Sequence, residues 1–124
     1  MLGLAQGIAI LLMAQAPAQV PAADGFGQQA LVEGRETAAI AQIMDNDAIE
    51  TDDPARLINL GIAYARQGDE TLARQLFEAA RDNRVRVNLE TVEGDWIDSR
   101  RLARQALAML ERGEFVAGQR VAAR

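Results

Sequence analysis

The sequence predicts an all-α fold of antiparallel helical hairpins, and three observations point to it. Apolar residues recur at three- and four-residue steps through two adjoining stretches, residues 54–67 and 70–81, with Gly68 between them as a turn. A less regular copy of this arrangement lies 34 residues upstream. The chain has 124 residues, of which 49% are hydrophobic, so it has room for one small domain.

The two central helices are each predicted to present one apolar face to the other. Small residues alternate with large ones along these faces, and each bulky side chain can fill the space that a small residue leaves. We therefore expect the helices to approach closely at Gly61, where any side chain would push them apart. The faces comprise Leu57, Leu60, Gly61 and Tyr64 on the first helix, and Leu72, Ala73, Leu76, Phe77 and Ala80 on the second.

The order of these residues, L-x-x-L-G-x-x-Y, then a turn glycine, then A-x-x-x-F-x-x-A, resembles the tetratricopeptide repeat. Shifting the chain by 34 residues, the period of that family, places GRETAA at 34–39 over GDETLA at 68–73. The resemblance implies a TPR-like right-handed solenoid of about three hairpins. Its parts would be a degenerate repeat at 24–53, a well-formed repeat at 54–83, an insertion at 84–97 and a degenerate helical hairpin at 98–123.

In tetratricopeptide proteins the first helix of each hairpin lines a concave groove that holds a peptide or a partner's helix. The resemblance therefore implies a non-catalytic scaffold for protein–protein interaction that needs no cofactor. Packing against the flanking first helices is the alternative role for Ile58 and Ile62. The groove face of the central repeat would comprise Ala55, Ile58, Asn59, Ile62, Ala65 and Arg66.

The first 18 residues form an apolar run without a charged side chain, and Ala16 and Ala18 at its end supply a small-residue cleavage site. This pattern predicts a signal peptide at 1–18, a flexible lead-in at 19–23, and an exported protein that is periplasmic or secreted. A buried first helix is one alternative. An uncleaved inner-membrane anchor is another, which would make the protein a membrane-tethered assembly or stability factor, although spanning needs about 20 apolar residues.

The chain lacks most of the side chains that enzymes use for catalysis. It contains no Cys and no His, and all 13 of its basic residues are Arg. Thiol nucleophiles, thiolate metal sites, imidazole bases and lysine Schiff bases are therefore excluded. A carboxylate-dependent hydrolase is the rival class, with candidates Asp45, Asp47, Asp52 and Asp53. Such chemistry needs a cleft that holds two acids in unlike environments, and we expect the run between the repeats to be solvated.

Five carboxylates lie within the nine positions from Asp45 to Asp53. A calcium loop of the EF-hand type is excluded, because its fifth and sixth positions would be Ile49 and Glu50 in place of an oxygen ligand and a glycine. We expect no metal here. The predicted role is structural: Asp53 caps a helix, and Pro54 takes its first position, where no amide hydrogen is needed.

Residues 84–97 interrupt the helical pattern. Residues 85–92 alternate and are rich in β-branched side chains, 93–95 form a turn signal, and Trp96 and Ile97 follow, which predicts a short hairpin or an extended loop. Trp96, the only tryptophan, is predicted either to fasten the insertion to the last helices or to anchor a partner. Acids interleave a nearby arginine cluster and favour ion pairs or a solvated face over nucleic-acid binding. The cluster comprises Arg81, Arg84, Arg86, Arg100, Arg101 and Arg104.

Overall fold

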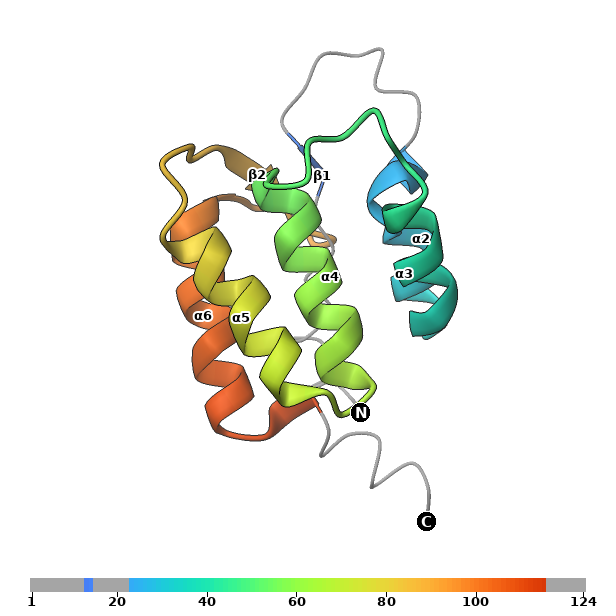
Figure 1. The fold of residues 1–124 in the computed structure, drawn as a ribbon. Coiled ribbons are helices and arrows are strands. Elements are labelled where there is room, and N and C mark those ends of the chain that lie inside the picture. Colours follow the sequence, from blue (N-terminus) through green and yellow to red (C-terminus); the bar gives the residue numbers. More distant parts are fainter. Residues whose placement is uncertain (1–12, 15–22, 116–124) are drawn as a thin grey trace.

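The computed structural model describes residues 13–14 and 23–115, and this part of the chain is mostly helical with one small antiparallel sheet (Figure 1). Most of the predicted signal segment, and the end of the helical hairpin predicted at 98–123, lie outside the described residues. The helices are η1 (Ala23–Phe26), α2 (Gln28–Val32), α3 (Glu36–Met44), α4 (Pro54–Arg66), α5 (Glu70–Arg81) and α6 (Ser99–Glu111). The strands are β1 (Met13–Ala14), β2 (Asn88–Glu90) and β3 (Trp96–Asp98).

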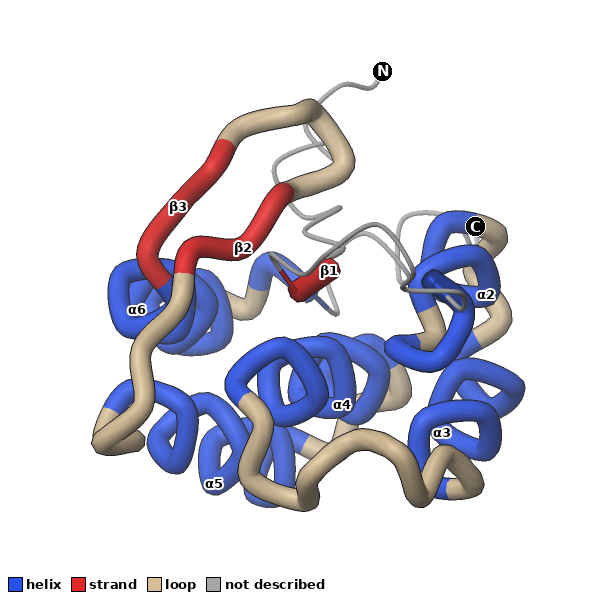
Figure 2. Tube along the Cα trace, turned by 90° about the horizontal axis from the view of Figure 1, so that it is seen from above, coloured by secondary structure: helices blue, strands red, loops and turns tan. Residues whose placement is uncertain are grey.

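The helices form two rows with α4 at the centre. Seen from above, α2, α4 and α6 follow one another along one side, while α3 and α5 lie on the other (Figure 2). Helix α5 packs against both α4 and α6, and α4 also contacts α3. The sheet lies on the side of α2, α4 and α6 (Figure 2). The predicted all-α class is thus confirmed at the level of helical content.

Helix α4 begins where the sequence places its cap. Oδ1 of Asp53 accepts hydrogen bonds from the backbone amides of Ala55 at 2.8 Å and Arg56 at 3.2 Å, and Pro54 takes the first position. These contacts satisfy amides that no helical carbonyl can reach. The chain then turns into α5 at Gly68, whose φ of 90° lies in the left-handed region. Glycine suits this position because residues with a side chain are strained in that region. The predicted capping role of Asp53 is confirmed.

The contact between α4 and α5 is closest at Gly61. A Cβ atom placed on Gly61 would lie 2.4 Å from Cε1 of Phe77. Phe77 is fully buried, and its ring stacks on that of Phe115 with the centroids 5.9 Å apart. The predicted close approach of the two helices at Gly61 is confirmed.

The start of the degenerate repeat predicted at 24–53 differs from the continuous first helix that the repeat pattern implies. The chain there is divided into η1 and α2 by Gly27, whose φ of 68° is left-handed and does not continue a helix. A Cβ atom on Gly27 would lie 3.0 Å from Cδ1 of Ile43 on α3. Gly27 therefore combines a close helix approach with a break in the chain direction.

The predicted hairpin in the insertion is confirmed as β2 and β3, joined by a turn in which Gly94 has φ of 91°. Leu89 pairs with Ile97 at its centre. The sequence did not predict the third strand: β1 pairs antiparallel with the other edge of β2, in the order β1-β2-β3. Figures 1 and 2 place β1 beside the first half of α4.

Candidate functional site

The residues predicted to line an open groove lie in the interior of the structure. All six are on α4, which is packed against α3, α5 and α6. The prediction of an open groove at these positions is therefore corrected, because other parts of the chain cover this helix. For Ile58 and Ile62, the packing alternative describes the structure. Arg66 keeps 14% of its side chain exposed, and the others are fully buried: Ala55, Ile58, Asn59, Ile62 and Ala65.

The two polar members of this set fasten α4 to the first hairpin. Nδ2 of Asn59 donates to the carbonyl oxygen of Phe26 at 2.8 Å. Nη1 of Arg66 donates to the carbonyl oxygen of Leu31 at 2.9 Å and lies 3.6 Å from Oε2 of Glu36. Burial lowers the pKa of Arg66, and the carboxylate of Glu36 opposes that shift. Both side chains thus serve the fold at positions where the repeat pattern expects ligand contacts.

Trp96 is the exposed aromatic side chain of the β2–β3 hairpin. Cross-strand pairing places Trp96 opposite Glu90 and Ile97 opposite Leu89. Because successive strand residues point to opposite faces, Leu89 and Ile97 belong to the face toward the core. Leu89 is fully buried, whereas 52% of Trp96 is exposed, so Ile97 rather than Trp96 fastens the hairpin to the core. We define the outer face of the hairpin as Asn88, Glu90, Trp96 and Asp98.

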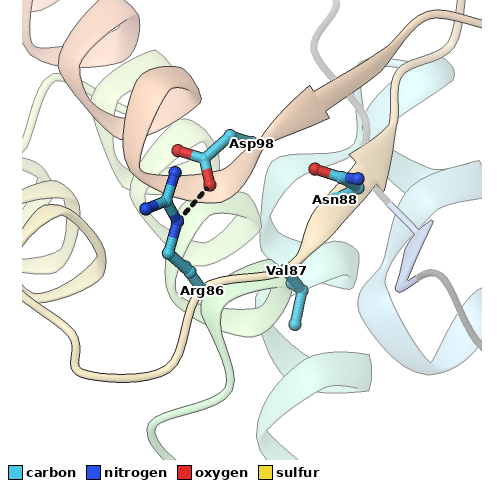
Figure 3. A pocket seen from close by; sticks show the side chains of 4 residues that line it. All are labelled: Arg86, Val87, Asn88 and Asp98. Carbon is cyan, nitrogen blue, oxygen red and sulfur yellow. Dashed lines mark hydrogen bonds and ion pairs between the residues drawn. The ribbon is translucent and has the colours of Figure 1, made fainter.

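A shallow depression lies at the base of the outer face. Arg86 and Asp98 turn toward each other there (Figure 3), and Nε of Arg86 donates to Oδ1 of Asp98 at 2.9 Å. Burial raises the pKa of Asp98, but hydrogen bonds from Arg86 and from the backbone amide of Arg101 outweigh it and the net shift is downward. Asp98 is thus ionised at neutral pH and joins the hairpin to α6. The depression measures about 400 Å³ and is lined by Arg86, Val87, Asn88 and Asp98.

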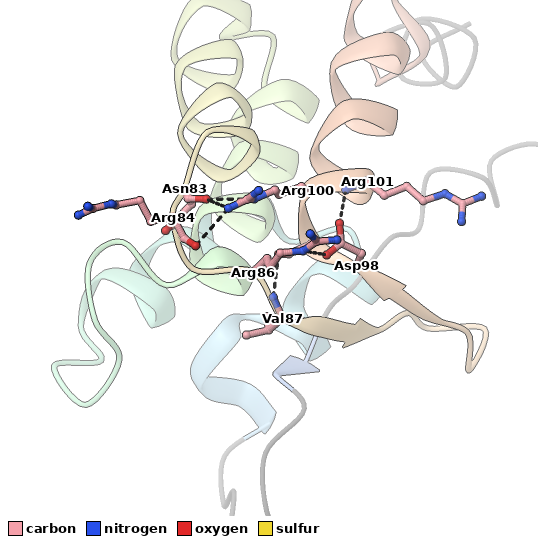
Figure 4. A network of polar contacts seen from close by, with 8 residues as sticks. Asn83, Arg84, Arg86, Val87, Asp98, Arg100 and Arg101 are labelled. Atoms are coloured by element: carbon pink, nitrogen blue, oxygen red, sulfur yellow. Dashed lines mark hydrogen bonds and ion pairs between the residues drawn. The ribbon is translucent and has the colours of Figure 1, made fainter.

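Polar contacts fix the base of the hairpin between the end of α5 and the start of α6 (Figure 4). Nη2 of Arg100 donates to the carbonyl oxygens of Asn83 at 2.8 Å and Arg84 at 3.1 Å. The backbone amide of Ser99 donates to the carbonyl oxygen of Val87 at 2.8 Å, and its Oγ accepts from the amide of Val87 at 3.1 Å. The base of the hairpin, which carries the outer face, is therefore fixed by hydrogen bonds between the segment that follows α5 and the start of α6.

Three of the six residues in the arginine cluster, Arg81, Arg86 and Arg100, are engaged with the protein itself. Arg81 pairs with Asp82 at 2.8 Å and Arg86 pairs with Asp98 at 2.9 Å, which confirms the predicted ion pairs at these two positions. The guanidinium of Arg100 donates its hydrogen bonds to backbone carbonyl oxygens. The exposed part of the arginine cluster is a solvated surface beside the base of the hairpin.

The acidic run before α4 forms no enclosed cleft. Asp45, Asp47 and Asp52 are exposed, and Asp53 is engaged as the helix cap. Burial raises the pKa of Asp53, and its hydrogen bonds from Arg56 and Ala55 oppose that shift. Within the described ranges, no group of three acidic, His or Cys side chains is placed to hold a metal ion. Nor does this part of the chain contain a helix both long enough and apolar enough to cross a membrane.

Comparison with known proteins adds no family, since no family model, no curated protein and no solved structure matches the chain. The class of protein therefore has to rest on the fold and on the outer face of the hairpin.

Proposed function

We propose that the protein is a non-catalytic protein-interaction module that binds a segment of a partner protein through the outer face of the β2–β3 hairpin. The observation that carries this proposal is Trp96, a half-exposed indole on a hairpin whose base is fastened to α5 and α6. Exposed tryptophans on rigid supports supply large contact area at little entropic cost, and they recur as energetic centres of protein interfaces.

The neighbours of Trp96 suit a peptide ligand. Glu90 lies opposite it, and Val92, in the turn, keeps 42% of its surface exposed. Toward the base, Asn88 offers an exposed amide beside the depression that Arg86 and Asp98 line. An apolar anchor with polar groups at its margin matches the usual anatomy of an interface, with an apolar centre and a polar rim.

The helical arrangement supports a tetratricopeptide-like solenoid as the scaffold. Helices α2, α4 and α6 alternate in sequence with α3 and α5, and the two sets lie in separate rows (Figure 2). The close approach of α4 and α5 at Gly61 follows the small-against-large pairing of such repeats. We propose three hairpins, the last formed by α6 and the segment that begins at Glu114.

A non-catalytic role agrees with the state of the acidic side chains. In the described part of the chain, each carboxylate whose pKa is shifted is a helix cap or the partner of a nearby side chain. Among these shifts, that of Asp53 includes a contribution from the neighbouring acid Asp52, which is smaller than those of burial and of the two amide hydrogen bonds, and Asp53 is already engaged as the cap of α4. The apolar start of the chain, with its Ala16 and Ala18, supports export to the periplasm or beyond.

The test compares capture of partners from the native host by the wild-type full chain and three variants of it. Trp96→Ala should lose the protein that the wild type enriches, and Trp96→Phe should retain part of it. Val32→Ala is the matched control, because Val32 is equally exposed, at 54%, but lies on α2 away from the hairpin. Circular dichroism melts of the three variants test whether each is folded. The same partner captured equally by Trp96→Ala and by the wild type would refute the proposal.

A further inference from the structure

The edge of β2 that faces away from β3 is a place where an extended segment is received. Strand β1 lies along it, with Met13 opposite Glu90 and Ala14 opposite Leu89. A free strand edge pairs readily with any extended segment that can supply amides and carbonyls in register.

The direction of the backbone groups identifies which β2 residues serve this edge. The amide of Thr91 donates to the carbonyl of Asp95, and the carbonyl of Val87 accepts from the amide of Ser99, so positions 87 and 91 face β3. Successive residues of a strand direct their backbone groups to opposite sides, and therefore position 90 faces β1. Glu90 and Met13 accordingly form a hydrogen-bonding pair, whereas the backbone of position 14 points away from β2.

The surroundings of the outer edge of β2 favour an apolar, uncharged segment. On the core face of β2 lies Leu89, which is fully buried. A segment added in the register of β1 places one residue opposite Leu89 and every second residue on the same face of the sheet, where a charged side chain would lose its hydration without a partner. The occupant supplied by the chain itself agrees, since residues 1–18 contain no charged side chain.

We propose that the outer edge of β2 binds an extended, apolar, uncharged segment of a partner protein by antiparallel strand addition. In the full-length chain β1 competes for the same edge, so that release or removal of β1 opens the site. This inference rests on the proposed function, because it names the kind of segment that a hairpin-based interaction module would take. The strand edge and Trp96 are nevertheless separate surfaces, one built from backbone groups and the other from a side chain.

The test measures binding of a peptide to purified full-length chains by fluorescence anisotropy. The probe is a labelled peptide with the sequence AILLMAQA, that of residues 9–16, followed by two lysines for solubility. Met13→Pro removes the amide that pairs with Glu90 and so weakens the competitor, and it should bind the probe at least tenfold more tightly than the wild type does. Ala14→Pro is the matched control: its missing amide points away from β2, and its affinity should stay at the wild-type level.

Amide hydrogen exchange then locates the bound peptide. In Met13→Pro the amide of Glu90 should exchange faster than in the wild type, and saturating probe should slow it again. The amides of Leu89 and Thr91, which face β3, should not change. Equal probe affinity of the two proline variants, or probe binding that leaves the Glu90 amide unprotected, would overturn the proposal.

Two further outcomes separate this site from other assignments. A wild-type dimer that Met13→Pro abolishes would assign the edge to a second copy of the chain and would also overturn the partner segment. Because the assay contains only the chain and the peptide, a negative result leaves the Trp96 capture experiment untouched. Conversely, loss of capture by Trp96→Ala does not depend on the β2 edge.

Discussion

Gly61→Ala is the most direct test of the packing between α4 and α5. In an exposed helix this change stabilises by about 1 kcal/mol, because alanine loses less backbone entropy than glycine. Here the added Cβ atom would lie 2.4 Å from Cε1 and 2.7 Å from Cδ1 of Phe77. Ordinary carbon–carbon contacts lie at about 3.5–4.0 Å, so the ring or the helix has to move by about 1 Å.

The ring of Phe77 has little room for such a movement. It is fully buried and stacks on Phe115, with an interplanar angle of 26°. Overpacking of this kind costs about 1–3 kcal/mol. Subtracting the gain of about 1 kcal/mol in helix propensity leaves a net loss of about 0–2 kcal/mol for Gly61→Ala. Gly61→Leu, with a larger side chain, should unfold the domain.

Urea unfolding followed by circular dichroism measures both the loss and its cause. Phe77→Leu lowers stability through a cavity, but it removes the ring atoms that an alanine at position 61 would meet. In the double variant Gly61→Ala should therefore cost nothing or stabilise, which gives a coupling energy of about 0.5–3 kcal/mol. A Gly61→Ala protein that is about 1 kcal/mol more stable than the wild type, as in an exposed helix, would show that the helices do not meet at Gly61.

Four further predictions concern the buried face of α4 and the caps. Ile62→Glu should unfold the domain, because the carboxylate would enter a fully buried position, and Tyr64→Ala should cost less because Tyr64 is only partly buried; thermal melts compare the two. Arg66→Ala should lower the free energy of unfolding by about 1.5–3 kcal/mol, since the Leu31 carbonyl loses a charged donor, and denaturant titration measures it, with Arg74→Ala as the exposed control. The folded state lowers the pKa of Asp98, so its stabilising contribution is present above about pH 4 and is lost as the pH falls through the folded value; the acid loss should therefore be smaller in Asp98→Asn. Burial raises the pKa of Asp53, so Asp53→Asn should instead steepen the acid loss.

The sequence predicted best what nearby residues determine. The cap at Asp53, the turn at Gly68 and the close approach at Gly61 all follow from spacing within one hairpin, and the structure has all three. The β2–β3 hairpin was likewise predicted, because alternation and a turn glycine lie within a dozen residues. Local patterns of this kind carry their own physical cause, in the orphan amides of a helix end or the two-residue period of a strand.

The errors concern relations between distant segments. The break at Gly27, where the chain approaches Ile43 across the hairpin, is not contained in the helical periodicity. Pairing of β1 with β2 joins an apolar run at the start of the chain to a strand far along it, and such a run is compatible with a strand or a helix. The pattern also shows which residues share a face of α4, but not what covers that face, so Ile62 was placed outward and Tyr64 inward.

The same contacts explain why the interaction surface belongs on the hairpin rather than on α4. The elements η1 and α2 span four and five residues, and helices so short are not stable alone. Their last turns leave carbonyls that need donors, and two of these, Phe26 and Leu31, are supplied by Asn59 and Arg66 of α4. A partner that took these donors would remove the hydrogen bond from Asn59 to the Phe26 carbonyl and the charged donor of the Leu31 carbonyl, which would keep only the amide of Gly34 at 3.1 Å. The side chains of the outer face donate no hydrogen bonds to these carbonyls of the first hairpin. A ligand can therefore bind Trp96 without breaking contacts that hold the fold together.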